Sequence, residues 1–149
     1  MKVAAATGAT AMLLFSAIPA NAGATVVSPH LVAGQVSAQA VSCSYSTNWS
    51  ESFTFKGVIY AGRGYAGHYG GLSTVPSKTS VTAAGVEAQC LLKRYGDYNP
   101  GTVDGVFGPN SQAAMRAFQS DMNSWFGAGL SVDGLPGPKT WPWLRWYEA

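Results

Sequence analysis

Asp104 and Asp133 occupy the same position in two copies of a repeated sequence motif. Their two carboxylates could form an acid/base pair. Both copies read V-D-G-x-x-G-P-x-[S/T], and the two aspartates are 29 residues apart. A hydrolase needs positioned acid and base groups of this kind. The same residues could instead cap turns, because Asp accepts hydrogen bonds from its own backbone and Gly tolerates positive φ. The identical local context of the two copies favours turn capping.

The other reactive side chains match no catalytic or metal-binding motif. His30 and His68 are isolated, with no HxH, HxxxH or CxxC, whereas a zinc site needs a cluster of ligands. Neither copy of the repeat has the alternating acids and closing glutamate of an EF-hand, and there is no GxSxG or SxxK. We therefore expect no catalytic residue, no metal and no cofactor. A cell-wall amidase or peptidase with an unrecognised site remains an alternative.

The N-terminal segment has the pattern of a secretory signal peptide. Lys2 provides a positive charge, residues 3–18 are dominated by small and apolar side chains, and Ala20-Asn21-Ala22 gives a small-x-small cleavage pattern. The apolar run is too short and too rich in Ala and Thr to favour a membrane span. We expect residues 1–22 to be removed on export, which leaves an extracellular protein that spans no membrane.

Cys43 and Cys90 are the only cysteines of the chain. In an exported protein an even number of cysteines indicates a disulfide, and two cysteines allow a single pairing. A catalytic thiol would need an activating histidine, and both histidines lie outside the helical part of the chain. We expect a Cys43–Cys90 disulfide.

The composition favours an uncharged partner. The formal charge is +2, charged residues make up 11% and aromatic residues 12%. No basic run provides the electrostatic footprint of a nucleic-acid-binding protein. A charge-poor, aromatic-rich surface suits glycans, although several of the rings must form the core of so small a protein.

Sequence patterns divide the rest of the chain into three parts. Residues 23–42 are predicted to be a flexible leader, and residues 43–80 an aromatic, Gly-rich extension. Within the extension, Ser52–Phe55 and Val58–Tyr60 could form a short hairpin about Lys56-Gly57. The Gly/Tyr-rich stretch 60–71 is either a surface loop or an aromatic platform.

Residues 81–149 are predicted to form a helical module. Helices are expected over Ala83–Arg94, Pro109–Asn123 and Pro138–Trp146. The second has an apolar stripe at helical spacing and begins at a Gly-Pro pair, where Pro fits the first helical position. Gly127-Ala128-Gly129 is expected to end it.

An ordered set of motifs runs through this module with short spacers. It consists of Gln89-x-x-Leu92, Gly96-x-Tyr98, Val103-Asp104-Gly105-x-Phe107-Gly108, Ala114-x-x-Ala117-Phe118-Gln119 and Asp133-Gly134-x-x-Gly137-x-x-Thr140-Trp141-x-x-Leu144. This order resembles the three-helix peptidoglycan-binding domain appended to many bacterial cell-wall hydrolases. The resemblance covers about residues 81–146. It implies an all-α fold, a compact three-helix module that carries the aromatic extension.

Two features depart from the pattern of that family. Gly85 stands where the first helix usually begins with an apolar residue. Either the helix start is shifted or Val81 supplies the missing contact. The segment 123–129 is longer than a minimal loop between the second and third helices.

The resemblance implies peptidoglycan as the partner, which offers sugar faces, amides and carboxylates. Aromatic rings can stack on sugar faces, and an Arg fork can bind a carboxylate. We expect Phe107, Phe118 and most of Trp141 to pack in the core, and Tyr98, Arg116 and Trp125 to face solvent. The candidate ligand contacts are Tyr95, Tyr98, Arg116, Gln119, Trp125 and Trp141.

The sequence thus predicts a secreted, monomeric, non-catalytic protein that binds the cell wall. The alternative is a secreted protein-interaction or inhibitor-like module, in which the same scaffold is kept and the Gly/Tyr-rich segment contacts a protein partner.

Overall fold

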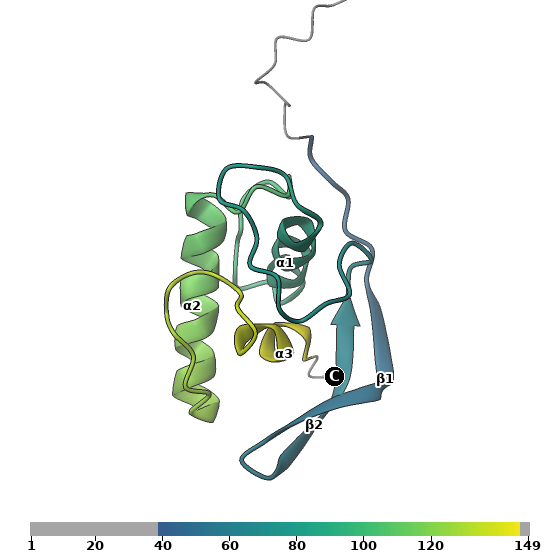
Figure 1. The fold of residues 1–149 in the computed structure, drawn as a ribbon, viewed down its shortest axis with the longest axis vertical. Coiled ribbons are helices and arrows are strands. Elements are labelled where there is room, and N and C mark those ends of the chain that lie inside the picture. Colours follow the sequence, from purple (N-terminus) through teal and green to yellow (C-terminus); the bar gives the residue numbers. More distant parts are fainter. Residues whose placement is uncertain (1–38, 147–149) are drawn as a thin grey trace, which may run out of the picture. The chain divides into compact units, whose positions relative to one another are not determined.

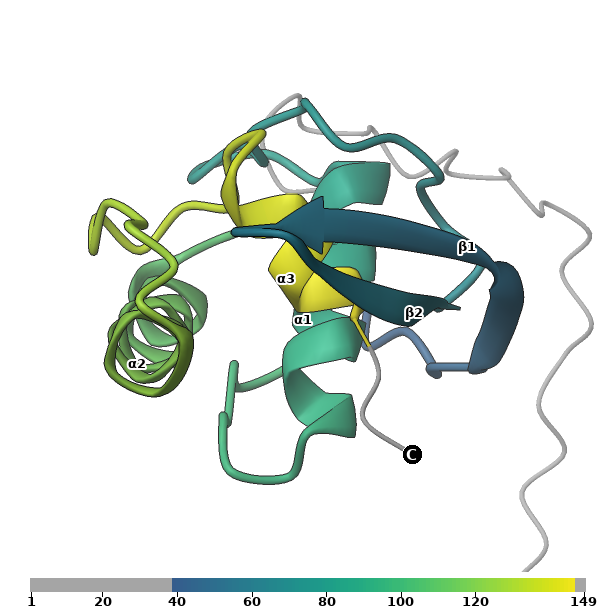
Figure 2. The ribbon, with the colours of Figure 1, turned by 90° about the horizontal axis from the view of Figure 1, so that it is seen from below.

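The computed structural model describes residues 39–146, and the predictions for residues 1–22, for most of 23–42 and for His30 lie outside that range. The elements follow one another as a hairpin and then three helices (Figure 1). Figure 1 shows α3 between α2 and the hairpin, and in Figure 2 the hairpin crosses in front of α3. The elements are β1 Ser46–Phe55, β2 Val58–Tyr65, α1 Ala83–Arg94, α2 Pro109–Phe126 and α3 Thr140–Arg145.

The expectation of an all-α fold is wrong, because β1 and β2 form a two-stranded antiparallel sheet. The turn lies at Lys56-Gly57, where φ is 48° and 79°. Two positive φ angles in a two-residue loop match the right-handed twist of the strands. The strands extend beyond the short hairpin predicted, to Ser46 and Tyr65, where Glu51 accepts hydrogen bonds from Arg63 and Tyr65 across the two strands. The predicted part of the hairpin packs its rings on the helical core. Phe53, Phe55 and Tyr60 are the partly buried rings that make this contact.

Helix α1 has the predicted bounds and begins at a capped turn. The Thr82 hydroxyl accepts a hydrogen bond from the Gly85 amide at 3.0 Å, which satisfies one unpaired donor of the first turn. A Cβ on Gly85 would lie 2.1 Å from the carbonyl oxygen of Gly105. The glycine therefore permits the turn of the first repeat to pack directly on α1, while Val81 is exposed.

Helix α2 begins as predicted, with Gly108 as N-cap and Pro109 in the first turn, and runs to Phe126. Gly127 ends it in the left-handed conformation at φ 59°, and its amide hydrogen-bonds to the carbonyl of Asn123. The helix is three residues longer than predicted because Ser124, Trp125 and Phe126 contain no breaker. Helix α3 begins at Thr140, two residues later than predicted.

The core lies where the three helices and the hairpin meet. Phe107 and Phe118 are fully buried, as predicted. Trp141 is fully buried as well, which corrects the expectation that part of its ring faces solvent and contacts the ligand. Trp143 makes a T-shaped contact with Phe53 of the hairpin and stacks on Phe126, with the ring centroids 5.0 Å and 5.3 Å apart. Among residues 39–146, no helix has the combined length and apolarity that a membrane span needs.

The predicted Cys43–Cys90 disulfide is present. Cys90 lies on the buried face of α1, and the two Cα atoms are 5.6 Å apart. Nearby, the Val41 amide donates to the Val103 carbonyl at 2.7 Å. The chain before the hairpin is therefore attached both to α1 and to the first repeat.

Candidate functional site

Both copies of the repeated phrase fold into the same carboxylate-capped turn. Asp104 Oδ1 accepts a hydrogen bond from the Val106 amide at 2.9 Å, and Asp133 Oδ1 accepts one from the Leu135 amide at 2.9 Å. The turn-capping role predicted for the two aspartates is confirmed.

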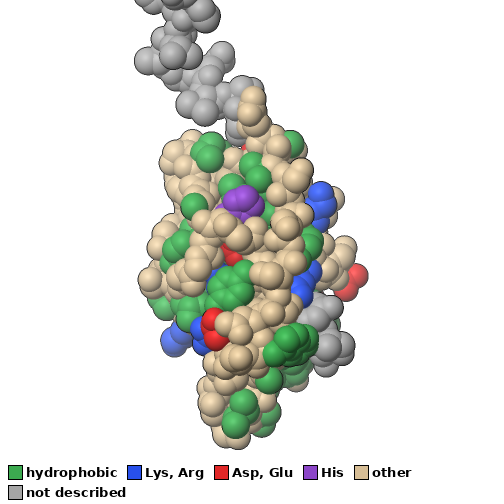
Figure 3. Space-filling view, turned by 90° about the vertical axis from the view of Figure 1, so that its right-hand side faces the viewer, with side chains coloured by type: hydrophobic (Ala, Val, Ile, Leu, Met, Phe, Trp, Pro, Cys, Tyr) green, Lys and Arg blue, Asp and Glu red, His purple; other side chains and the backbone are tan. Residues whose placement is uncertain are grey.

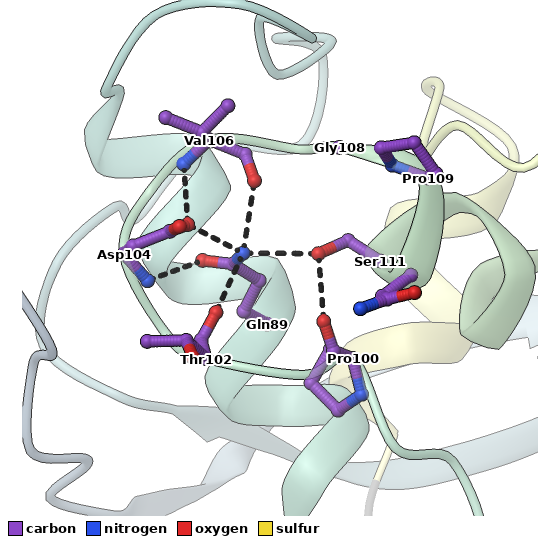
Figure 4. Close-up of a pocket in the computed structure, with 9 residues that line it drawn as sticks. Gln89, Pro100, Thr102, Asp104, Val106, Gly108, Pro109 and Ser111 are labelled. Atoms are coloured by element: carbon purple, nitrogen blue, oxygen red, sulfur yellow. Dashed lines mark hydrogen bonds between the residues drawn. The ribbon is translucent and has the colours of Figure 1, made fainter. Parts of the chain in front are cut away.

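A buried glutamine beneath each turn fixes its shape. Gln89 on α1 accepts a hydrogen bond from the amide of Asp104 at 3.1 Å (Figure 4). It also accepts one from the amide of Gly105 at 2.8 Å. An amide group carries two protons and can satisfy only part of a larger set of acceptors at once. The acceptors within hydrogen-bond distance of its nitrogen are Thr102 O, Asp104 Oδ1, Val106 O and Ser111 Oγ.

Gln119 on α2 plays the equivalent part in the second repeat. Its oxygen accepts from the Gly134 amide at 2.9 Å, and its nitrogen reaches Asp133 Oδ1 at 3.1 Å and Thr140 Oγ1 at 3.3 Å. The side chain is fully buried. This residue, a predicted ligand contact, holds the second turn in place and does not face solvent.

Each repeat also lines a pocket at the surface. The pocket of the first copy contains Asp104 and Ser111 and measures about 220 Å³ (Figure 4). That of the second copy contains Asp133 and Thr140 and measures about 320 Å³. Because the two aspartates line different pockets, they do not form an acid/base pair across a shared site.

A third pocket gathers three of the six predicted contacts and is called the aromatic pocket here. It has a volume of about 320 Å³ and lies between the C-terminal ends of α1 and α2. Tyr95, Tyr98 and Trp125 are the predicted residues that it brings together. Its complete lining is Arg94, Tyr95, Asp97, Tyr98, Met122, Trp125, Phe126 and Trp146.

The two tyrosines form the inner wall of the aromatic pocket. Tyr95 donates from its hydroxyl toward the carbonyls of Trp143 and Trp146, which attaches it to the end of α3. Tyr98 is only 5% exposed and donates to Asp121 Oδ2 at 2.9 Å. Burial, together with the Asp121 carboxylate, raises the pKa of the Tyr98 hydroxyl. The prediction that Tyr98 faces solvent is wrong, because the loop after α1 folds its ring edge-on against Phe118.

Trp125 forms the outer wall and is 62% exposed, as predicted. Its ring meets Phe126 edge-on, with centroids 6.5 Å apart. Arg94 and Asp97 add one charge of each sign to the lining. An exposed indole beside charged hydrogen-bonding groups can contact both the apolar face and the hydroxyls of a sugar.

The other predicted contacts lie elsewhere. Arg116 is exposed, as predicted, and packs beside Gly134 in the second repeat. Trp141 is fully buried, and its indole nitrogen donates to the Thr74 carbonyl at 2.9 Å.

Other residues that line the aromatic pocket were not predicted from the sequence, namely Arg94, Asp97, Phe126 and Trp146. No motif marks them, because they meet only after the end of α3 returns to the ends of α1 and α2. In the part of the chain that the structure describes, no three His, Cys, Asp or Glu side chains cluster as metal ligands would.

Comparison with known proteins agrees with this architecture. A protein from Kitasatospora aureofaciens, described as an uncharacterized protein in the bpoA1 3' region, is 37% identical over 83 residues. The match covers 54% of this chain and 65% of that relative, so the chain spans less than two thirds of its length. No solved structure matches the chain. Residues 84–144 match the family described as "Putative peptidoglycan binding domain".

Proposed function

We propose that this protein is exported and binds peptidoglycan without cleaving it, and that the aromatic pocket contacts a sugar face. The observation that carries the proposal is the position of Tyr95, Tyr98 and Trp125. These three rings, predicted from the sequence as ligand contacts, line one pocket, and all three lie in the segment that matches the peptidoglycan-binding family.

The surface chemistry supports a mainly uncharged ligand. Figure 3 shows one face of the molecule, on which most of the surface is uncharged and the charged side chains lie in a few small groups. Aromatic stacking and a few hydrogen bonds contribute a small favourable binding free energy, and the entropic cost of association reduces it further. We expect weak binding to a single glycan and stronger retention on an insoluble, repetitive polymer.

Further support concerns export and the lack of catalysis. The disulfide fits an oxidising, extracellular location, as does the signal-like pattern of residues 1–22. Asp104 and Asp133 are both engaged in turn capping. Neither carboxylate is therefore poised to act on a bound glycan.

The test is a Trp125→Ala variant assayed for retention on insoluble peptidoglycan. We expect a fivefold to tenfold weaker apparent affinity, about 1 to 1.4 kcal/mol, because the stacking face is lost. The melting temperature should move by only a few degrees, since surface substitutions usually cost less than about 0.5 kcal/mol. Trp49→Ala is the matched control, because Trp49 is also exposed but lies on the hairpin.

Unchanged retention of Trp125→Ala would show that the aromatic pocket is not the contact surface. An equal loss for Trp49→Ala would show that retention depends on exposed indoles in general and not on this pocket.

The second candidate function, a protein-interaction module, is favoured by the tip of the hairpin. Val58 is 54% exposed and Ile59 69% exposed, next to the Lys56-Gly57 turn and outside the matched segment. A Val58→Thr/Ile59→Thr variant keeps β-branched residues in the strand while removing the apolar surface. Under the peptidoglycan proposal it is retained normally. Loss of retention by this variant would place the contact on the hairpin.

A further inference from the structure

A pocket between the hairpin and α3 is built partly from residues outside the matched family. It is called the hairpin pocket here and measures about 360 Å³, which is within the range of small-ligand sites. One wall comes from β1, and the others come from the loop after α2 and from α3. The lining residues are Phe53, Thr54, Phe55, Ala128, Gly129, Lys139, Pro142 and Trp143.

Several contacts hold the walls of the hairpin pocket in place. Phe53 and Phe55 meet the ring of Trp143 edge-on, with centroids 5.0 Å and 5.2 Å apart. At the tip of the hairpin, Lys56 Nζ donates to the Gly127 carbonyl at 3.0 Å. The pocket is thus preformed, which lowers the ordering cost of binding.

The chemistry of the lining is apolar except for a hydroxyl and one cation. Lys139 is exposed and, among the described residues, forms no ion pair. No acidic side chain lines the pocket. A ligand with a carboxylate near Lys139 and a small apolar group on the floor complements this lining.

The same residues are poorly suited to stacking on a sugar. Trp143 is only 2% exposed, so its ring face is not open to solvent. The ammonium of Lys56 lies over the ring of Phe55, 5.1 Å from its centroid. With the Trp143 face buried and one face of Phe55 covered, the remaining apolar surface fits methyl groups better than a pyranose face.

We propose that the hairpin pocket binds the carboxylate end of a short peptide whose last residues carry small aliphatic side chains. The carboxylate pairs with Lys139, and a terminal methyl group rests on Ala128 and Pro142. The inference deepens the proposed function, because the peptides of peptidoglycan present such ends. Its test uses a free peptide and does not depend on retention by the polymer.

The experiment is an NMR titration of the full chain with N-acetyl-alanyl-alanine, in its all-L and all-D forms. At least one form should shift the backbone amide signals of Thr54, Ala128 and Gly129. The corresponding dipeptide amide, which lacks the carboxylate, should bind at least fivefold more weakly.

Variants at Lys139 distinguish the contribution of its positive charge to peptide binding from that of its side-chain size. Lys139→Gln should weaken binding of the free acid at least fivefold, and Lys139→Arg should restore most of it. Lys78→Gln is the matched control, because Lys78 is exposed and lies outside the pocket. It should bind like the unmodified protein.

Three results would each overturn the inference. They are equal binding of the acid and the amide, no effect of Lys139→Gln, and shifts confined to another part of the molecule. If any of these occurred while Trp125→Ala still lost retention on peptidoglycan, the proposed function would stand without the hairpin pocket. Peptide binding by a protein that peptidoglycan does not retain would support the pocket and reject the proposed function.

Discussion

Glu87 of α1 and Arg145 of α3 form a fully buried ion pair, with 2.9 Å between Glu87 Oε1 and Arg145 Nη1. The two carboxylate oxygens also accept hydrogen bonds from the amides of Ala66, His68 and Tyr69. These bonds fix the backbone of the Gly/Tyr-rich stretch against α1.

Arg145 completes the same network from the other side. Its Nη1 donates to the Gly64 carbonyl at 3.2 Å, and its Nη2 donates to the carbonyls of Gly71 and Tyr69. Its guanidinium lies 4.4 Å from the ring centroid of Tyr65. The ion pair therefore joins the segment from Gly64 to Gly71 to two helices, and this segment is part of the folded unit.

We predict that breaking this pair is costly. Glu87→Gln or Arg145→Met should each lower the free energy of unfolding by about 3–5 kcal/mol, because each leaves a buried charge without its partner. The double variant should lose clearly less than the sum of the two losses. Urea unfolding measures all three.

The control is Glu51→Gln, which breaks the more exposed pair with Arg63, where the closest atoms are 3.2 Å apart. Exposed pairs contribute about 0–1 kcal/mol, so its loss should be small. Strict additivity of Glu87→Gln and Arg145→Met would show that the two side chains do not act as a pair.

The role of Gln119 gives a second prediction. Gln119→Ala should lower the free energy of unfolding by at least about 2 kcal/mol, because it leaves buried groups of the second turn without hydrogen bonds. Gln112→Ala serves as the control, since Gln112 is half-buried and its side chain donates to the Phe107 carbonyl near the start of the same helix. If Gln119→Ala were as stable as the unmodified protein but lost retention on peptidoglycan, Gln119 would be a ligand contact after all.

Tyr69 gives a prediction on pH. Its hydroxyl oxygen accepts hydrogen bonds from the amides of Thr74 and Ser73, at 3.0 Å and 3.3 Å. The hydrogen bonds from Thr74 and Ser73 favour the phenolate and lower the pKa of Tyr69 from 10.0 to about 8. The difference between the ultraviolet titrations of the unmodified protein and Tyr69→Phe should therefore show a tyrosine that ionises near pH 8.

Stability should follow the same ionisation. The pKa of Tyr69 is 10.0 in the unfolded chain and about 8 in the folded chain. Between these values the unfolded chain holds the Tyr69 proton and the folded chain releases it, so the folded state gains stability as pH rises. The gain is complete above the unfolded pKa and absent below the folded one. Between pH 8 and 10, the melting temperature of the unmodified protein should rise relative to that of Tyr69→Phe. If the two melting temperatures changed with pH in the same way, the lowered pKa would be contradicted.

Local signals in the sequence predicted the helices well. The bounds of α1 and the Gly-Pro start of α2 follow from residues within one turn of the feature. Gly127 ends α2 as the expected breaker, three residues after the predicted last residue Asn123. The disulfide was predictable because two cysteines allow only one pairing.

Features that depend on long-range packing were not predictable. The hairpin is longer than predicted because contacts distant in the sequence hold its outer part, such as the hydrogen bond from Arg145 to the Gly64 carbonyl. Tyr98 was expected in solvent because loops are usually exposed, but its ring packs on Phe118 and its hydroxyl finds Asp121. The aromatic pocket could be predicted only in part. The sequence identified Trp125 but gave no sign that Phe126 and Trp146 line the same pocket.

Peptidoglycan binding is tested most directly by a pull-down of the purified protein on insoluble peptidoglycan, with cellulose and chitin as controls. We predict that the protein is retained on peptidoglycan and recovered in the unbound fraction with both control polymers. Retention should weaken fivefold to tenfold in Trp125→Ala, whose fold is checked by its melting temperature. Recovery of the unmodified, folded protein in the unbound fraction with peptidoglycan would show that it does not bind this polymer.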